Sequence, residues 1–296
     1  MTGRGPLATV TLIALAVGAA VGACSQAAGG PASTPEPRDH PAGATDLVVR
    51  ISTSGGLLPA EARLSELPVA SLYGDGQLIT LGPRIAIYPG PAMPNLQVTK
   101  LSSAGTERIL AAAAAAGLLG PNRHYDYPGI ADAPTTTFTV FAGGARHDVS
   151  AYALTEGSDP GRLTESDRRA RGALLSFQRQ LTDPRSWLGK DVEGEDRPYQ
   201  AKAIRIVVTP ADPRAVPEQS LVNVRDWPLA GPLGTFGAPR AHGSARCGVV
   251  SGQDLAAVSG ALGASNQLTF WRSDGRTYRL AVRPLLPDEH GCPPEP

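Results

Sequence analysis

The side chains that could catalyse a reaction are few in this chain, and their spacing matches no common catalytic motif. A serine hydrolase needs a nucleophile on a tight turn, often within GxSxG, and a base in reach; no GxSxG occurs. His147 beside Asp148 comes nearest to a base with its carboxylate, but such a pair in a hairpin is typical of a solvated surface. The metal-binding spacings CxxC, HxH and HExxH and the glycine motifs that bind phosphate are also missing. The sequence therefore predicts no catalytic residue, cofactor site or metal site.

The amino-terminal segment carries the most specific motif. Residues 7–20 form an uncharged apolar run, typical of a secretion signal, and at about 14 residues it is shorter than the about 20 that a membrane-spanning helix needs. It leads into Val21-Gly22-Ala23-Cys24, which resembles the bacterial lipobox. The resemblance implies that residues 1–23 are removed as a signal peptide and that Cys24 carries fatty acyl chains such as palmitate, which would hold the chain at the membrane. An ordinary secretory signal and a retained membrane helix are the alternatives.

Residues 24–45 are expected to form a disordered tether. The segment contains Gly29-Gly30 and four prolines but almost no large apolar side chain, so it cannot bury enough surface to offset the chain entropy lost on folding. Its Pro and Gly content favours a loose spacer between the bilayer and a folded domain. His40, within this tether, is expected to be solvated.

Two further cysteines lie near the carboxyl end. Once Cys24 is acylated, Cys247 and Cys292 remain, and an even number of cysteines in an oxidising compartment favours a disulfide. The bond would close a loop of roughly 45 residues and contribute roughly 4 kcal/mol on the chain-entropy model. It would also hold the proline-rich tail that runs from Pro284 to Pro296.

Strand and helix patterns alternate from Asp46 onward. Alternating apolar residues predict strands over 47–52 and 204–208, and a further strand is expected over 96–100. Glycine-containing turns predict three hairpins, which pair 69–73 with 77–81, 136–141 with 146–152, and 268–272 with 276–282. Capping residues and apolar spacing predict helices over 102–116, 164–182 and 251–262.

The order strand, helix and hairpin occurs twice, over 46–152 and 203–283. It predicts an α+β fold of two similar halves, each a mainly antiparallel sheet with hairpins and a helix packed on one face. The expected boundaries are 46–183 for the first half, 184–201 for a connector and 202–296 for the second half with its disulfide-tied tail. The helix over 164–182 is expected to bridge the halves, and length leaves open whether they form one domain or two.

The charge composition indicates which class of partner the chain does not bind. The 27 basic and 27 acidic residues give no net charge, which argues against a nucleic-acid-binding protein because such proteins carry a basic excess. The loop from Asn122 to Tyr127 combines polar and aromatic groups between a predicted helix and a hairpin, where binding sites tend to lie. Aromatic residues in loops can bind sugars or peptides, although core packing or loop anchoring is the simpler explanation for each of the candidates here, which are Tyr73, Tyr88, Tyr125, Tyr127, Trp187, Trp227 and Trp271.

Short segments extend the resemblance beyond the lipobox. They are 72–76 (LYGDG), 88–91 (YPGP) and 266–272 (NQLTFWR), together with an excess of arginine over lysine. With these features the whole chain resembles the uncharacterised lipoproteins of high-GC actinobacteria, which implies the extracytoplasmic face of the cell membrane and no particular activity. We therefore expect a non-catalytic, lipid-anchored envelope protein that binds a protein or a cell-wall component. The alternative is an envelope hydrolase with an unrecognised carboxylate or serine site.

Overall fold

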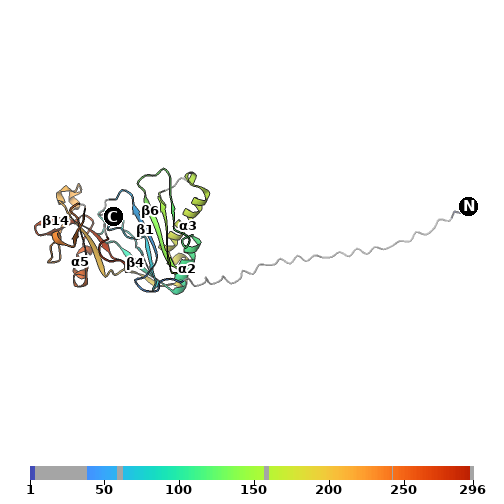
Figure 1. The fold of residues 1–296 in the computed structure, drawn as a ribbon, viewed down its shortest axis with the longest axis horizontal. Coiled ribbons are helices and arrows are strands. Elements are labelled where there is room, and N and C mark those ends of the chain that lie inside the picture. Colours follow the sequence, from blue (N-terminus) through green and yellow to red (C-terminus); the bar gives the residue numbers. More distant parts are fainter. Residues whose placement is uncertain (4–38, 59–62, 157–159, 242, 294–296) are drawn as a thin grey trace. The chain divides into compact units, whose positions relative to one another are not determined.

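The computed structural model describes residues 1–3, 39–58, 63–156, 160–241 and 243–293 (Figure 1). The expected signal peptide, Cys24 and the expected tether as far as Arg38 lie outside the described residues, apart from residues 1–3. The described chain from Asp39 onward belongs to one compact unit, residues 35–296. Among the described helices, none is both long enough and apolar enough to span a membrane.

The first half is built on a large sheet. Its strands are β1 (Leu47–Gly55), β2 (Ala70–Tyr73), β3 (Gln77–Leu81), β4 (Leu96–Leu101), β5 (Arg123–Tyr125), β6 (Pro134–Ala142), β7 (Ala145–Tyr152) and β8 (Val192–Pro198). They lie in the order β5-β7-β6-β1-β2-β3-β4-β8. All neighbours are antiparallel except β5 and β7, which are parallel. Two of the predicted hairpins are therefore present, as β2–β3 and β6–β7.

Helices cover one face of this sheet (Figure 1). Helix α2 (Ser103–Ala115) begins at Ser102, whose side chain accepts a hydrogen bond from the Gly105 amide at 3.2 Å. Helix α3 (Glu165–Thr182) begins at Thr164, whose side chain accepts one from the Asp167 amide at 3.1 Å, and a short α4 (Arg185–Leu188) follows. The helices share a core with alternate residues of the strands. The strand residues in this core include Val49, Ile51, Phe138 and Val140, and the helix residues include Ile109, Leu110, Leu174, Phe177 and Leu181. The intervening residues of the strands point away from the helices.

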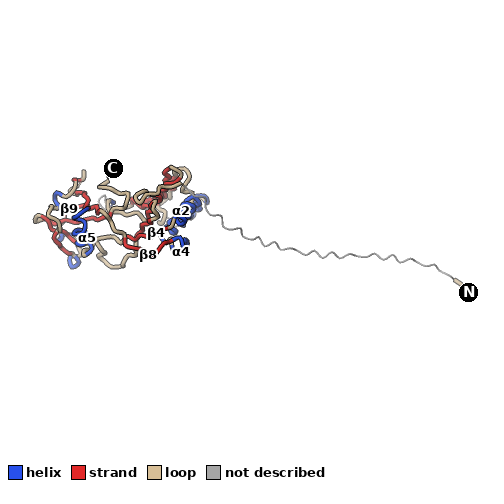
Figure 2. The backbone as a smooth tube through the Cα atoms, turned by 90° about the horizontal axis from the view of Figure 1, so that it is seen from below, coloured by secondary structure: helices blue, strands red, loops and turns tan. Residues whose placement is uncertain are grey.

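The second half contains a smaller sheet and one α-helix. Its strands are β9 (Ala203–Pro210), β10 (Asn223–Asp226), β11 (Ala238–Pro239), β12 (Arg246–Ser251), β13 (Thr269–Ser273) and β14 (Arg276–Pro284), and the helix is α5 (Leu255–Gly263; Figure 2). The strand order is β10-β13-β14-β9-β12-β11, with β10 parallel to β13 and the other pairs antiparallel. Val258 and Leu262 of α5 pack in one core with Trp227 and Trp271, whose rings meet edge to face at 6.0 Å.

Single turns of 3-10 helix complete the described secondary structure. They occur at Pro160–Arg162, Gly189–Asp191, Pro213–Ala215, Gln219–Leu221, Leu233–Thr235 and Gly252–Asp254. The last of these precedes α5, so the helix expected from Ser251 begins at Leu255.

The structure confirms the α+β class and the two sheets, but it differs at the predicted connector. Residues 184–201 contain α4 and the edge strand β8, which pairs with β4. Nearly every side chain of β8 is exposed, so no apolar alternation identifies it as a strand. Helix α3 does not bridge the halves, because Leu174, Phe177 and Leu181 are buried in the core of the first half.

The last residues of the expected tether pack on the first half. The carbonyl of Asp39 accepts a hydrogen bond from the Gly143 amide at 2.7 Å. His40 is not solvated as expected: its side chain is only 17% exposed and its Nε2 lies 3.7 Å from a carboxylate oxygen of Glu107. The folded part therefore includes the chain from Asp39 onward, since these contacts compensate for the conformational entropy that the tether was expected to keep.

Candidate functional site

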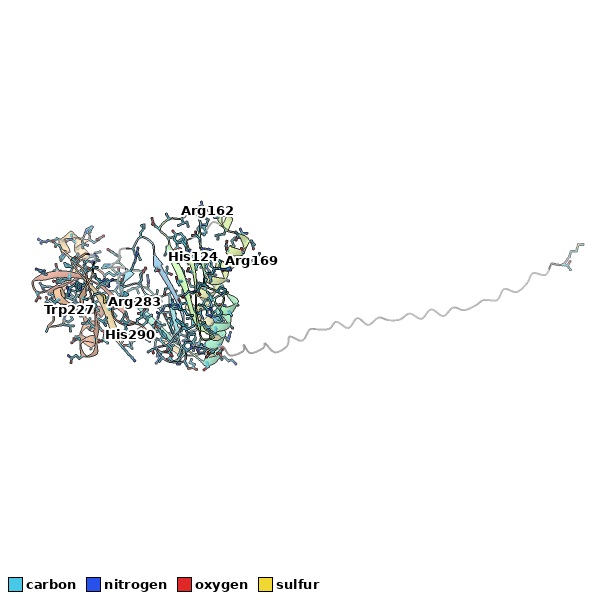
Figure 3. All side chains as sticks on the ribbon, in the orientation of Figure 1. His124, Arg162, Arg169, Trp227, Arg283 and His290 are labelled. Atoms are coloured by element: carbon cyan, nitrogen blue, oxygen red, sulfur yellow. A yellow bond between two sulfur atoms is a disulfide. The ribbon has the colours of Figure 1, made fainter. Side chains whose placement is uncertain are left out.

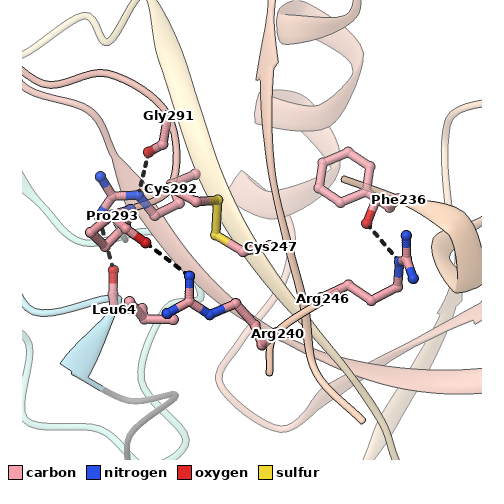
Figure 4. The surroundings of a disulfide bond; sticks show 9 residues. Leu64, Phe236, Arg240, Arg246, Cys247, Gly291, Cys292 and Pro293 are labelled. Carbon is pink, nitrogen blue, oxygen red and sulfur yellow. Dashed lines mark hydrogen bonds between the residues drawn. A yellow bond between two sulfur atoms is a disulfide. The ribbon is translucent and has the colours of Figure 1, made fainter. Parts of the chain in front are cut away.

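The two cysteines expected to pair do lie at disulfide distance. Cys247 of β12 and Cys292 are bonded, with their Cα atoms 6.1 Å apart (Figure 4). The bond fixes residues 285–293, here called the C-terminal segment. Arg205 of β9 and Arg240 also hold this segment, because each donates a 2.8 Å hydrogen bond to a backbone carbonyl within it (Figure 4).

The C-terminal segment brings two carboxylates to the boundary between the sheets. Asp288 accepts hydrogen bonds from both Nη atoms of Arg50 on β1, at 2.9 and 2.7 Å, and from the Tyr73 hydroxyl on β2 at 2.7 Å. Glu289 pairs with Arg283 of β14, which lies where the sheets meet (Figure 3). These five residues form the junction cluster, which ties strands of both sheets to the C-terminal segment.

Burial and pairing together set the protonation of the junction cluster. Burial raises the pKa of Tyr73 far above its usual value, against the opposing effect of Arg50, so the phenol remains a donor. Burial alone would raise the pKa of Asp288, but the hydrogen bond and charge of Arg50 and the hydroxyl of Tyr73 outweigh it and lower that pKa. Asp288 is therefore an anion held between a cation and a neutral phenol.

A cavity of about 180 Å³, the junction cavity, opens beside the junction cluster. Its lining includes Ser52 and Ser54 of β1 and the charged residues Arg63, Glu66 and Arg283. Arg63 is exposed and, among the residues that the structure describes, its side chain has no hydrogen bond or ion-pair partner. Burial raises the pKa of Glu66, while Arg63 and Arg283 oppose that rise. The cavity thus presents an exposed guanidinium group whose donors have no hydrogen-bond partner among the described residues and whose charge interacts with Glu66.

A row of hydroxyl groups crosses the sheet from this cavity, on the face away from the helices. Ser52 pairs in register with Thr137 of β6, Thr137 with Ser150 of β7, and Ser150 with His124 of β5. In-register neighbours lie on one face of a sheet, and three strand intervals of about 4.8 Å give the row a length of about 14 Å. These four residues are here called the hydroxyl row, and His124 marks its outer end (Figure 3).

The members of the hydroxyl row have hydrogen-bonding capacity to spare. His124 Nδ1 and Ser150 Oγ lie 2.8 Å apart. The side chains of Ser52 and Thr137 make no hydrogen bond to other described residues and are partly exposed. Each hydroxyl can donate one hydrogen bond and accept two, so the row offers several positions to a hydroxyl-bearing ligand.

A charged group and an aromatic ring flank the hydroxyl row. Asp148 of β7 accepts hydrogen bonds from Thr139 at 2.6 Å and from Arg146 at 2.8 Å. Burial opposes the lowering of the pKa of Asp148, but these two hydrogen bonds and the charge of Arg146 outweigh it. The guanidinium of Arg146 lies 5.9 Å from the centre of the partly exposed Phe141 ring, which is four residues along β6 from Thr137.

A second cavity, of about 250 Å³, lies at the start of α2. Its lining includes His40, Asp75, Lys100 and Ser102. Lys100 donates to the carbonyl of Asp75, Ser102 caps the helix, and His40 approaches Glu107. Because these polar groups already have partners within the protein, the junction cavity is the better candidate for a ligand site.

The candidate residues of the sequence analysis are dispersed over the fold. Of the Asn122 to Tyr127 loop, the central part forms β5, and only its His124 joins the site. His147 contacts the Gly120 carbonyl through Nδ1 at 3.0 Å, His290 is exposed, and His242 lies outside the described residues. Most candidate aromatic residues are buried or partly buried, namely Tyr73, Tyr125, Tyr127, Trp187, Trp227 and Trp271, whereas Tyr88 is 63% exposed.

Sequence reasoning missed most of the residues that line the site. Arg50 and Ser52 on β1, and Thr137 on β6, alternate with buried apolar residues. This alternation is a local signal of a sheet with one polar face. No local signal connects Arg50 with Asp288, which lies 238 positions further along the chain.

No model of a known protein family, no curated protein and no solved structure matches this chain. Its function is therefore argued from the chemistry of the site. The site offers hydroxyl groups, an imidazole and a guanidinium in fixed positions. Among the described residues, the side chain of His124 is hydrogen-bonded to Ser150. In a catalytic triad a carboxylate orients the imidazole, and no described carboxylate is hydrogen-bonded to His124.

Proposed function

We propose that this chain is a non-catalytic, lipid-anchored protein of the cell envelope that binds a cell-wall component. The lipobox resemblance at residues 21–24 supports the anchor, and the paired Cys247 and Cys292 fit an oxidising compartment outside the cytoplasm. The anchor would place the folded unit at the extracytoplasmic face of the cell membrane. The resemblance to actinobacterial lipoproteins points to the same location.

The hydroxyl row beside the junction cavity is the observation that supports binding. Sheet hydrogen bonds hold the backbone of Ser52, Thr137, Ser150 and His124 in register, so little backbone freedom is lost when a ligand binds. The row lies on a sheet face rather than at a sheet edge, so its donors and acceptors are side chains. Such a surface suits a ligand with many hydroxyl groups, as wall polysaccharides have.

Replacing two members of the hydroxyl row should weaken binding to wall material. We expect the double variant His124→Ala/Thr137→Val to bind isolated, insoluble cell wall about tenfold more weakly than the wild type, because two hydrogen bonds of roughly 0.7 kcal/mol each are lost. Co-sedimentation of the detergent-solubilised full chain measures the affinity. Valine keeps the shape and strand preference of threonine at position 137, so the fold should persist.

Thr235→Val is the matched control, since Thr235 is an exposed threonine in the second half. It should leave wall binding unchanged. Equal affinities for the wild type and the double variant, at equal thermal stability, would refute binding through the hydroxyl row. The competing function, an envelope hydrolase, predicts instead that the protein releases soluble fragments from wall material and that Ser150→Ala abolishes their release.

The anchor can be tested independently of the ligand. Metabolic labelling with a fatty acid should mark the wild type but not Cys24→Ala, since only a thiol can form the thioether that the lipobox resemblance implies. The unlabelled variant should also appear in the soluble fraction. Equal labelling of both proteins would contradict acylation at Cys24, and release of unlabelled wild-type protein into the medium would favour an ordinary secretory signal.

A further inference from the structure

We infer that the wall ligand is an acidic oligosaccharide whose carboxylate group enters the junction cavity against Arg63 while its hydroxyl groups follow the hydroxyl row. This inference rests on the proposed function and specifies the chemistry of the ligand. Two independent features of the site lead to it: the charge balance at the cavity and the continuity of the cavity with the row.

The junction holds one more guanidinium group than carboxylate groups, and Arg63 is the exposed guanidinium among them, with no hydrogen bond or ion pair to described residues. Arg50 is paired with Asp288 and Arg283 with Glu289. Glu66 is the remaining carboxylate that lines the cavity, and it is shared electrostatically by Arg63 and Arg283. Arg205 adds a fourth guanidinium, whose described hydrogen bonds go to backbone carbonyls.

Four guanidinium groups therefore face three carboxylates at the junction. The buried Nε of Arg283 has no hydrogen-bond partner among the described residues. The pKa of Arg283 and that of Arg205 are both lowered, first by burial and also by neighbouring arginines. One carboxylate from a ligand would balance this excess, and the planar guanidinium of Arg63 can bind it through two parallel hydrogen bonds.

The cavity is small and continuous with the hydroxyl row. Its volume of about 180 Å³ corresponds to about six water molecules at about 30 Å³ each, which suits a carboxylate and part of one sugar ring. Ser52 belongs both to the lining of the cavity and to the row. The row extends about 14 Å further across the sheet, so a ligand that uses both features must be longer than one sugar ring.

Other classes of ligand fit this surface less well. A peptide that adds a strand pairs with the backbone of an edge strand, whereas the hydroxyl row consists of side chains on a sheet face, and only His124 among them belongs to the edge strand β5. A nucleic acid needs several cations in line with its phosphates, and the hydroxyl row carries none. A hydroxyl-rich chain with a single carboxylate near one end matches both the row and Arg63.

The test uses two probes that differ only at the carboxyl position. One is a tetrasaccharide with a single glucuronic acid at one end followed by three N-acetylglucosamine units, and the other is the same molecule with its carboxyl group reduced to an alcohol. Calorimetric titration of the detergent-solubilised full chain should give about tenfold tighter binding for the acidic probe, because a charge-assisted bidentate contact is lost on reduction. Arg63→Ala should remove this difference, and Arg63→Lys should retain part of it.

Arg276→Ala is the matched control, because Arg276 is an exposed arginine at the tip of the β13–β14 hairpin; it should leave both affinities unchanged. A third tetrasaccharide, in which N-acetylmuramic acid replaces the glucuronic acid, presents the carboxylate on a lactyl ether. Tighter binding of this probe than of the glucuronic acid probe would identify peptidoglycan as the source of the carboxylate, and the reverse would identify a uronic acid polymer.

Different results would exclude the carboxylate site and wall binding. Equal binding of the acidic and the reduced probe, or an Arg63→Ala variant that still discriminates between them, would overturn the carboxylate site while leaving wall binding intact. Absence of binding to both probes and to insoluble wall material would overturn the proposed function itself. Thermal unfolding of each variant is the control for folding, and Arg63 is exposed, so its replacement should not change the midpoint.

Discussion

Replacing both Cys247 and Cys292 with alanine should lower the free energy of unfolding by about 4 kcal/mol. The bond closes a loop of 45 residues, and on the chain-entropy model its removal restores to the unfolded chain a conformational freedom of about that magnitude. The double substitution should also destabilise the folded state, because this bond holds the C-terminal segment to β12. Only the hydrogen bonds of Arg205 and Arg240 and the contacts of the junction cluster would then retain it.

Urea unfolding followed by circular dichroism measures this effect. The double variant and the reduced wild type should show similar midpoints, both well below that of the oxidised wild type. Cys24→Ala is the matched control, because it replaces a cysteine outside the disulfide loop and outside the compact unit of residues 35–296, and it should leave the midpoint unchanged. A double variant within about 1 kcal/mol of the wild type would show that the loop is restrained by other contacts, contrary to the chain-entropy argument.

Replacing Arg50 with alanine should cost about 3 kcal/mol at neutral pH. The substitution leaves the Asp288 carboxylate partly buried without its cation, and breaking a buried pair from one side is costly for that reason. Arg185→Ala is the matched control. Arg185 also lies 2.7 Å from its partner, Asp196, but both side chains are more than 40% exposed, against 17% and 22% for Arg50 and Asp288. An exposed pair contributes less than about 1 kcal/mol.

The deficit of Arg50→Ala should shrink as the solution is acidified. The pKa of Asp288 is lowered in the folded wild type, so its pairing stabilises the fold fully above the usual carboxyl pKa and is lost as pH falls through the lowered value. Without Arg50, burial should raise the pKa of Asp288, and protonation then relieves the variant at a higher pH. Urea midpoints from pH 7 to pH 3 test this, and a deficit independent of pH would contradict the role of Asp288.

These two sets of substitutions should not be additive. Asp288 reaches Arg50 because the disulfide holds the C-terminal segment at the boundary of the sheets. Without the disulfide, the segment can separate from the junction, and Arg50→Ala then removes a contact that is already weakened. We expect the cost of Arg50→Ala to fall by more than about 1 kcal/mol in the cysteine-free background, as is found for residues that share one network.

Local chemistry accounts for the elements that were predicted correctly. Helices α2 and α3 begin where Ser102 and Thr164 can cap them. The β6–β7 and β13–β14 hairpins form at Gly143-Gly144 and Asp274-Gly275, where both residues have positive φ as a tight turn requires. The strands that were missed, β5, β8, β10 and β11, are edge strands with many exposed side chains, which leave no apolar alternation in the sequence.

The sequence by itself determined the α+β class, the hairpins, the capped helices and the pairing of Cys247 with Cys292, because each depends on neighbouring residues or on a count of thiols. Only the tertiary structure decided which polar residues meet. The hydroxyl row is set by the registers of β1, β6, β7 and β5, and the contact of Arg50 with Asp288 is set by how the C-terminal segment returns to the first sheet. Contacts between residues so far apart in the chain depend on the packing of whole elements, which no local pattern encodes.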